Sequence, residues 1–92
     1  MKGIFRTTAG EIASITGGRI VAGADNVSIE TVTTDSRELG VNNLFIPIVG
    51  EKFDGHDFIP ELFTSGKISC SLTMKEGFET AAAESGKSLI IC

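Results

Sequence analysis

Two short polar clusters hold most of the residues of this 92-residue chain that could bind a ligand or do chemistry. The first, Thr34-Asp35-Ser36-Arg37, follows an alternating, β-branched stretch at 27–34. Open α/β sheets place ligand sites where a strand ends and a loop begins. There Asp35 or Ser36 could orient a hydroxyl or a ring NH, and Arg37 could bind a phosphate oxygen. The alternative is an Asx turn with a solvated arginine.

The second cluster follows an apolar run and precedes a predicted helix. It comprises Gly50, Glu51, Lys52, Phe53, Asp54, Gly55, His56 and Asp57. Its glycines permit close backbone approach, and the helix N-terminus that follows favours an anion. His56 beside two aspartates could suggest a metal site or an acid–base pair, but the spacing matches no metal signature and no triad nucleophile is visible. We therefore predict a structural His–Asp hydrogen bond that stabilises the loop.

Two other features predict no site. Gly86-Lys87-Ser88 resembles the end of a phosphate-binding P-loop, but Ala81 stands where that motif needs glycine, and the predicted helix precedes it rather than follows. A turn from helix to strand is the better interpretation. Cys70 and Cys92 each fall in a predicted strand, far from any Cys or His partner, and are predicted to be buried free thiols.

Short strands and helices must position these clusters. A capping box at Thr8 and Glu11 predicts a helix over 8–16, which Gly17-Gly18 ends. Further helices are predicted at 58–63, with Asp57 as N-cap and Gly66 after it, and at 75–84. Strands are predicted at 19–22, 27–34, 44–49, 68–72 and 89–92, with 35–43 a loop and a bulge or unpaired NH side at Pro47. This alternation predicts a layered α/β domain with a mostly parallel or mixed sheet and short helices.

Length and charge narrow the class further. Ninety-two residues make one domain at most, and 8 basic against 12 acidic residues give a net charge of −4, which argues against a nucleic-acid-binding surface. No apolar run reaches the roughly 20 residues of a membrane span, and the N-terminus lacks the apolar region of a signal peptide. We expect a cytoplasmic protein with no membrane or nucleic-acid partner.

In their order and spacing, the two clusters resemble the N-terminal domain of Mur ligases. The likeness rests on Asp35-Ser36-Arg37, on Leu44-Phe45-Ile46-Pro47-Ile48 with Gly50, and above all on Phe53-Asp54-Gly55-His56-Asp57-Phe58. Glu11-Ile12-Ala13 and Thr16-Gly17-Gly18 fit the same pattern, so the resemblance runs from about residue 7 to 92. The His-Asp-Phe continuation favours the member of the family that adds the dipeptide D-Ala-D-Ala.

The resemblance implies a bacterial, cytoplasmic enzyme of peptidoglycan synthesis, an ATP-dependent amide-forming ligase. It implies that residues 1–92 form the domain that holds the UDP end of a UDP-MurNAc-peptide, while the ATP- and magnesium-binding domain and the C-terminal domain lie outside this chain. The UDP moiety is then expected at Thr34, Asp35, Ser36, Arg37, Gly50, Glu51, Lys52 and Phe53, with Asp54, Gly55, His56 and Asp57 shaping the loop. No catalytic residue, metal ligand or cofactor is expected in this domain, which alone should be inactive, and the parent enzyme is expected to be a monomer.

Two alternatives stay open. The same fold could serve as a non-catalytic regulatory or interaction module, because a fold does not determine a function. The chain could also belong to the sibling ligase that adds diaminopimelate or lysine.

Overall fold

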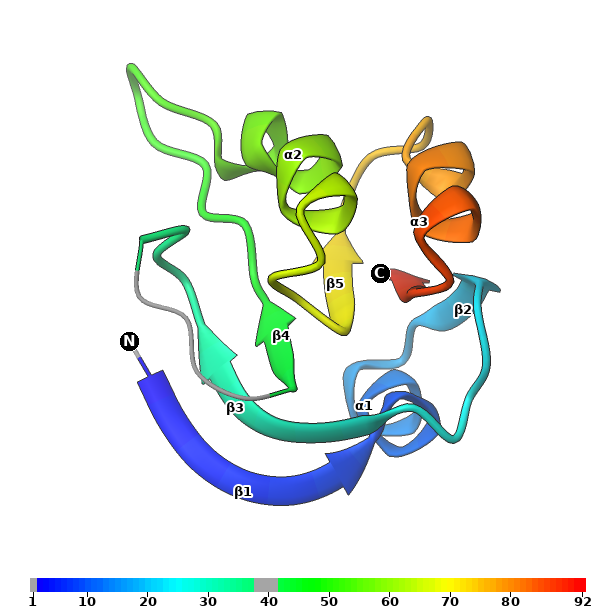
Figure 1. Cartoon of the computed structure of the whole chain (residues 1–92). Helices are drawn as coiled ribbons and strands as arrows, with labels where there is room; N and C mark the ends of the chain where they lie inside the picture. The colour runs from blue at the N-terminus through cyan, green and yellow to red at the C-terminus, as the bar shows by residue number, and fades with distance from the viewer. Residues whose placement is uncertain (1, 38–41) are drawn as a thin grey trace.

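A computed structural model describes residues 2–37 and 42–92 of the chain (Figure 1). The strands are β1 (Lys2–Thr8), β2 (Arg19–Ala22), β3 (Ser28–Thr33), β4 (Asn43–Phe45), β5 (Cys70–Thr73) and β6 (Ser88–Ile91). The helices are α1 (Ala9–Thr16), the 3-10 helix η1 (Gly55–Phe58), α2 (Ile59–Thr64) and α3 (Glu79–Ser85). The predicted α/β class with short helices is confirmed.

Within the described residues, six strands form one mixed sheet in the order β1-β3-β4-β5-β6-β2. The four central strands are parallel, whereas β1 pairs with β3 and β2 pairs with β6 in antiparallel fashion. The sheet curls into a half-barrel, with β1 and β3 curving beneath the shorter strands in Figure 1. Because the central strands are parallel, the loops that follow β3, β4 and β5 leave from the same edge.

Two hydrophobic clusters pack on opposite faces of this sheet. One contains Leu44 of β4 and residues of α1, and the other contains Phe45 of β4 with residues of α2 and α3. Successive side chains of a strand point to opposite faces, so these two neighbours in β4 contribute to the two clusters. Figure 1 shows α1 on one side of the sheet and α2 with α3 on the other.

The first helix forms as its capping pattern predicts. The Thr8 side chain accepts a hydrogen bond from the Glu11 N–H, and Gly17 ends the helix at φ 72°. A left-handed residue at this position is the usual reason for glycine after a helix. In α2 the C-cap is Ser65, and the predicted glycine, Gly66, follows it at φ 73°.

The strand predicted at 44–49 is too long: β4 ends at Phe45. The Ile46 N–H still donates to the Thr33 carbonyl at 2.9 Å, but Pro47 has no N–H with which to extend the ladder. Ile48 and Val49 are 46% and 53% exposed rather than buried, and Val49 forms an isolated bridge with Asp54. The predicted buried strand is therefore an ordered, projecting loop in its second half.

Two predicted helices begin elsewhere. Asp54, not Asp57, caps the helical segment, because its side chain accepts from the His56 N–H and a turn of 3-10 helix precedes α2. The helix predicted at 75–84 starts only at Glu79. A turn between the Thr73 side chain and the Lys75 backbone, followed by Gly77 at φ 108°, occupies the residues before it.

Other differences from the prediction concern the first strand, the cysteines and the loop after β3. Strand β1 was not predicted. Cys70 is buried and free as predicted, but Cys92 is exposed, so the prediction of burial is wrong for it. Of the loop predicted over 35–43, residues 38–41 lie outside the described residues, and Asn43 already belongs to β4.

Candidate functional site

The loops that follow β3 and β4 enclose a groove of about 570 Å³ at the carboxyl edge of the sheet. It is lined by Thr34, Asp35, Ser36, Arg37, Ile48, Phe53 and Phe58. The structure thus brings one whole predicted cluster together with one residue of the other. The position agrees with the rule that ligands of open α/β sheets bind beyond the carboxyl ends of the strands.

A tight turn after β3 forms one wall of the groove. The Asp35 carboxylate accepts from the Arg37 backbone N–H at 2.8 Å, and the Arg37 side chain donates to the same carboxylate from Nε at 3.1 Å and from its terminal nitrogen at 3.2 Å. Thr33 holds the start of the turn through the Asp35 backbone. The Arg37 side chain is 87% exposed. The Asx turn considered for this cluster is present, and it presents a guanidinium to solvent beside the groove.

Electrostatics keep this turn charged. Hydrogen bonding from the Arg37 side chain, and then from its backbone, holds the pKa of Asp35 below its usual value. A carboxylate that accepts such bonds favours its ionised form. Asp35 therefore stays an acceptor, and Arg37 keeps a fixed orientation.

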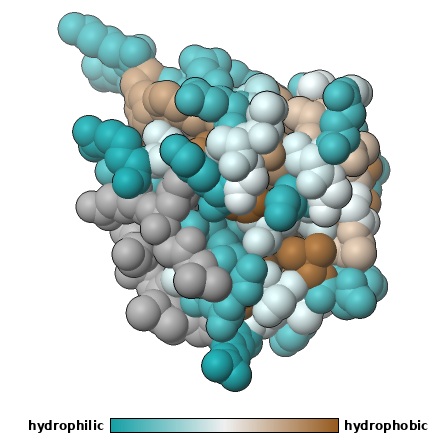
Figure 2. Space-filling view, in the orientation of Figure 1, coloured by the Kyte–Doolittle hydropathy of each residue, from teal (hydrophilic) through white to brown (hydrophobic). Residues whose placement is uncertain are grey.

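The opposite wall is apolar and aromatic. The rings of Phe53 and Phe58 lie 6.0 Å apart at 44°, and Phe53 is 48% exposed. Ile48 adds a half-exposed aliphatic surface. In Figure 2, apolar surface lies directly beneath the hydrophilic tip of the loop between β4 and η1, toward the upper left. The groove therefore pairs a polar turn with a surface suited to a flat ring.

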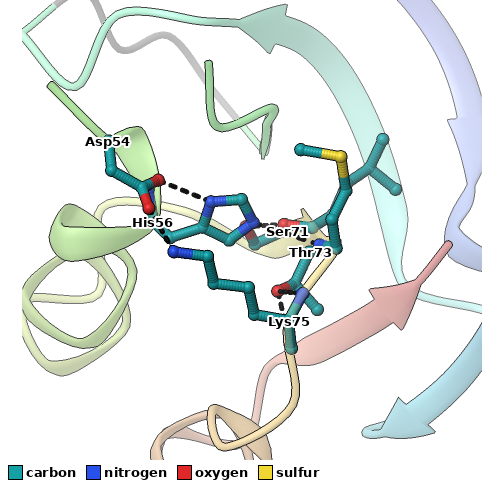
Figure 3. A network of polar contacts seen from close by, with 7 residues as sticks. Asp54, His56, Ser71, Thr73 and Lys75 are labelled. Carbon is teal, nitrogen blue, oxygen red and sulfur yellow. Dashed lines mark hydrogen bonds and ion pairs between the residues drawn. The ribbon is translucent and has the colours of Figure 1, made fainter. Parts of the chain in front are cut away.

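Contacts behind the groove hold the second loop in place. His56 is buried; its Nδ1 lies 2.7 Å from Asp54 Oδ1, and its Nε2 accepts from the Met74 backbone N–H at 3.1 Å (Figure 3). Lys75 donates to the other oxygen of Asp54. The predicted structural His–Asp hydrogen bond is confirmed, with Asp54 as the partner, and the prediction that these residues shape the loop remains consistent with this position.

The remaining predicted residues lie apart from the groove lining. Gly50, Glu51 and Lys52 are exposed in the projecting loop, and Asp57 is exposed on η1. Gly55 is buried against the backbone of Ile48. Within residues 2–37 and 42–92, no group of three or more His, Cys, Asp or Glu side chains could hold a metal ion.

The sequence did not predict the apolar wall of the groove. It also did not predict the contacts of Met74 with His56 and of Lys75 with Asp54. Ile48 belonged to a predicted buried strand and Phe58 to a predicted helix, so neither was assigned to a site. Lys75 fell at the start of the helix predicted over 75–84 and Met74 just before it, about 20 residues from the loop that they support. The polar character of 73–77, with its threonine and glycine, was the available signal against a helix there.

Comparisons with known proteins identify the family of this chain. The family model described as "Mur ligase family, catalytic domain" matches residues 28–89, which is 62 of the 92 residues and includes both clusters. Among the described residues, no helix is long and apolar enough to cross a membrane.

Several curated relatives are similar over shorter stretches. The UDP-N-acetylmuramoyl-tripeptide–D-alanyl-D-alanine ligase of Bacillus subtilis is 50% identical over 38 residues, which is 41% of this chain and 8% of the relative. The enzyme of the same name from Escherichia coli is 37% identical over 63 residues, 68% of this chain and 14% of the relative. A UDP-N-acetylmuramoyl-L-alanyl-D-glutamate–2,6-diaminopimelate ligase of Clostridium acetobutylicum is 38% identical over 47 residues, 51% and 10% respectively.

The aligned part of this chain thus spans about a tenth of the length of these relatives. The family model, in contrast, covers about two thirds of the chain itself. This match, together with the mixed α/β sheet that is consistent with it, establishes that the chain belongs to the Mur ligase family.

Proposed function

We propose that this chain is the UDP-sugar-binding domain of an ATP-dependent, amide-forming ligase that adds D-Ala-D-Ala to UDP-MurNAc-tripeptide in peptidoglycan synthesis. One observation carries the proposal: residues 34–37 and Phe53, for which the family resemblance implies contact with the UDP moiety, line one groove. The names of the B. subtilis and E. coli relatives support the same substrate and product.

The groove offers a complementary surface for each part of a uridine diphosphate. The half-exposed ring of Phe53 can stack on a pyrimidine, an interaction worth about 1–3 kcal/mol per base. Ser36 and the turn backbone can hydrogen-bond ring or ribose atoms. Arg37 can meet the diphosphate, since its guanidinium is exposed beside the groove and its charge is not lost at any physiological pH.

Positive charge extends behind the turn. Ser36 and Arg37 also line a neighbouring polar hollow of about 670 Å³ together with Lys67 and Lys87. In a chain of net charge −4, basic residues that gather here favour an anionic ligand at this end of the molecule. Gly50, Glu51 and Lys52 would flank the ligand from the tip of the projecting loop.

ATP and Mg²⁺ belong to the rest of the proposed enzyme. Gly86 and Lys87 form the turn between α3 and β6, and Ser88 begins β6, so this segment does not start a helix. We propose that the domain alone binds UDP-sugar without forming an amide bond. We propose a monomeric, cytoplasmic parent enzyme whose partner is the UDP-MurNAc-peptide.

NMR titration of the 15N-labelled chain with UDP-MurNAc-tripeptide tests the binding proposal. We expect shifts in the amides of 34–37 and 50–55, and binding weaker by about 10- to 150-fold in Arg37→Ala, because a charge-assisted contact is worth about 1.5–3 kcal/mol. Arg19→Ala is the matched control, since Arg19 is exposed on β2, four strands away from β3 in the sheet. Saturating ligand without shifts in either loop would contradict the assignment and favour an interaction module.

The diaminopimelate-adding sibling is a second candidate. The C. acetobutylicum relative supports it, because its name specifies that amine and a shorter peptide substrate. Assays of the complete enzyme with D-Ala-D-Ala or diaminopimelate as acceptor, each with its matching UDP-MurNAc-peptide, separate the two. The first proposal requires phosphate release with D-Ala-D-Ala as acceptor and none with diaminopimelate.

A further inference from the structure

We propose that His56 is a positioning residue: as a neutral imidazole with its proton on Nδ1, it joins the loop that carries Phe53 to the segment after β5 and so sets the width of the groove. The inference rests on the proposed function only where ligand affinity is the readout. His56 itself does not line the groove, and Phe53 and Phe58, its neighbours along the chain, do.

The hydrogen bonds define which nitrogen carries the proton. A backbone N–H can only donate, so the Met74 N–H requires an unprotonated Nε2 at 3.1 Å. Nδ1 then carries the proton and donates to Asp54 Oδ1 at 2.7 Å. Both ring nitrogens are satisfied only in this tautomer, which is the form that the buried site selects.

The ring also connects two segments that are distant along the chain. Figure 3 shows His56 between Asp54 on the η1 side and the end of β5, where Thr73 and Lys75 lie. The ring stacks on Phe78 at 6.0 Å and 22°, and Lys75 reaches back to Asp54. The loop after β4 is thereby fixed to the segment before α3 by side-chain contacts rather than by a sheet ladder.

Further contacts transmit this position to the groove. The Gly55 N–H donates to the Ile48 carbonyl at 2.8 Å, and the Gly50 N–H donates to the Phe53 carbonyl at 2.7 Å. Ile48 and Phe53 are both groove-lining residues. Displacement of η1 would therefore move the apolar wall relative to the turn at Asp35.

A second proton on His56 would break the connection. Nε2–H would face the Met74 N–H, a donor facing a donor. The charged groups of this network are Asp54, from the same segment as His56, and Lys75, from the segment after β5; Asp57 acts electrostatically on Lys75. Hydrogen bonds from Lys75 and His56 lower the pKa of the Asp54 carboxyl, so Asp54 remains the acceptor for Nδ1–H through mildly acidic conditions.

Two variants separate packing from hydrogen bonding. His56→Phe keeps a ring against Phe78 but removes both hydrogen bonds, whereas His56→Gln keeps an oxygen acceptor for the Met74 N–H. We expect affinity for UDP-MurNAc-tripeptide to fall about tenfold in His56→Phe. A tenfold loss corresponds to a loop that adopts its binding-competent position in about a tenth of the molecules. In His56→Gln the loss should be less than about threefold.

A spectroscopic measurement tests the hydrogen bond between Met74 and His56 in the absence of ligand. In the 15N-labelled chain at neutral pH, we expect scalar coupling across the hydrogen bond from the Met74 amide nitrogen to His56 Nε2, and shifts at Phe53 in His56→Phe. A protonated Nε2 at neutral pH, or unchanged Phe53 and affinity in a folded His56→Phe, would overturn the inference. If the wild type binds no UDP-sugar, the proposed function fails, while the coupling and the Phe53 shifts still decide the role of His56.

Discussion

The carboxylate of Asp54 binds His56 through one oxygen and Lys75 through the other. It also accepts from the His56 backbone N–H at 2.9 Å, which starts η1. One side chain thus acts as a helix cap and as an ionic partner. Such a group stabilises the fold only while it is ionised.

The pH dependence of stability follows from Asp54. Its pKa lies below the usual value of 3.8, chiefly because Lys75 hydrogen-bonds to the ionised form. A lowered folded-state pKa contributes stability above the unfolded-state value, and that contribution is lost as the pH falls below about 4. We expect Asp54→Asn to lower the Tm at neutral pH and to flatten its decline in acid.

Thermal unfolding followed by circular dichroism from about pH 6 down to about pH 3 measures this effect. Asp25→Asn, at an exposed turn position, is the control and should keep the slope of the wild type. Parallel curves for wild type and Asp54→Asn would contradict the role of the carboxylate.

The two thiols are expected to differ in reactivity. Burial raises the pKa of Cys70 to about 12, while Cys92 is exposed. Because the thiolate is the reactive form, a thiol reagent such as DTNB should modify one cysteine per native chain quickly and the second only after unfolding. Cys92→Ser should abolish the fast phase; a fast phase that survives in this variant would show that Cys70 is accessible.

At the scale of elements, the loop between β4 and η1 depends on a close backbone approach at Gly55. A Cβ at this position would lie 2.7 Å from the Ile48 nitrogen and 3.0 Å from the Pro47 Cα, both backbone atoms. At Gly50 in the same loop, a Cβ would meet only ordinary contacts at 3.7 Å. Close backbone packing therefore requires glycine at position 55 but not at position 50.

We expect Gly55→Ala to lower the free energy of unfolding by about 1–3 kcal/mol, the usual effect of overpacking. Gly50→Ala, its matched control, should change it by less than about 0.5 kcal/mol, as typical of surface substitutions. Urea unfolding measures both. Equal stability of the two variants would show that the loop can move away from Gly55 without loss.

The elements that local patterns predicted well are those with local causes. The capping box at Thr8 and the glycine at 17 sufficed for α1, and alternation sufficed for β3. Errors arose where distant residues decide the outcome. The Thr73 turn and the His56–Met74 bond displace the start of α3, and the ladder ends before Pro47 although the residues after it are apolar.

The candidate site likewise combines features that the local sequence predicts with features that depend on distant residues. Both clusters could be located because each follows a strand, and their proximity follows from parallel strands that share one edge. The aromatic and aliphatic wall of the groove could not be predicted, because the exposure of Ile48 depends on the loop that projects after Pro47. The Lys75 contact required knowledge of how the β5–α3 segment passes behind η1.

At the scale of the whole molecule, one thin sheet separates two hydrophobic clusters, and β4 contributes to both. We expect Leu44→Ala and Phe45→Ala each to lower the free energy of unfolding by about 2–5 kcal/mol, because both side chains are almost fully buried. Since the clusters share strands, each variant should unfold in a single transition.

Coincident urea curves from far-ultraviolet circular dichroism and from NMR signals of both faces would support this expectation. Ile15→Ala, at a 78% exposed position of α1, is the control and should leave the midpoint nearly unchanged. Loss of one cluster in Phe45→Ala while the other keeps native signals would show that the faces fold independently.

The strand order has a consequence for synthesis on the ribosome. The first two strands lie at opposite edges of the sheet, β1 beside β3 and β2 beside β6. Strand β2, complete by residue 22, pairs only with residues 89–91 among its described sheet neighbours. It therefore stays without this partner until residues 89–91 have left the exit tunnel. A nascent chain arrested before β6 emerges should leave β2 without its partner strand, so one of the first strands to be translated completes its pairing late.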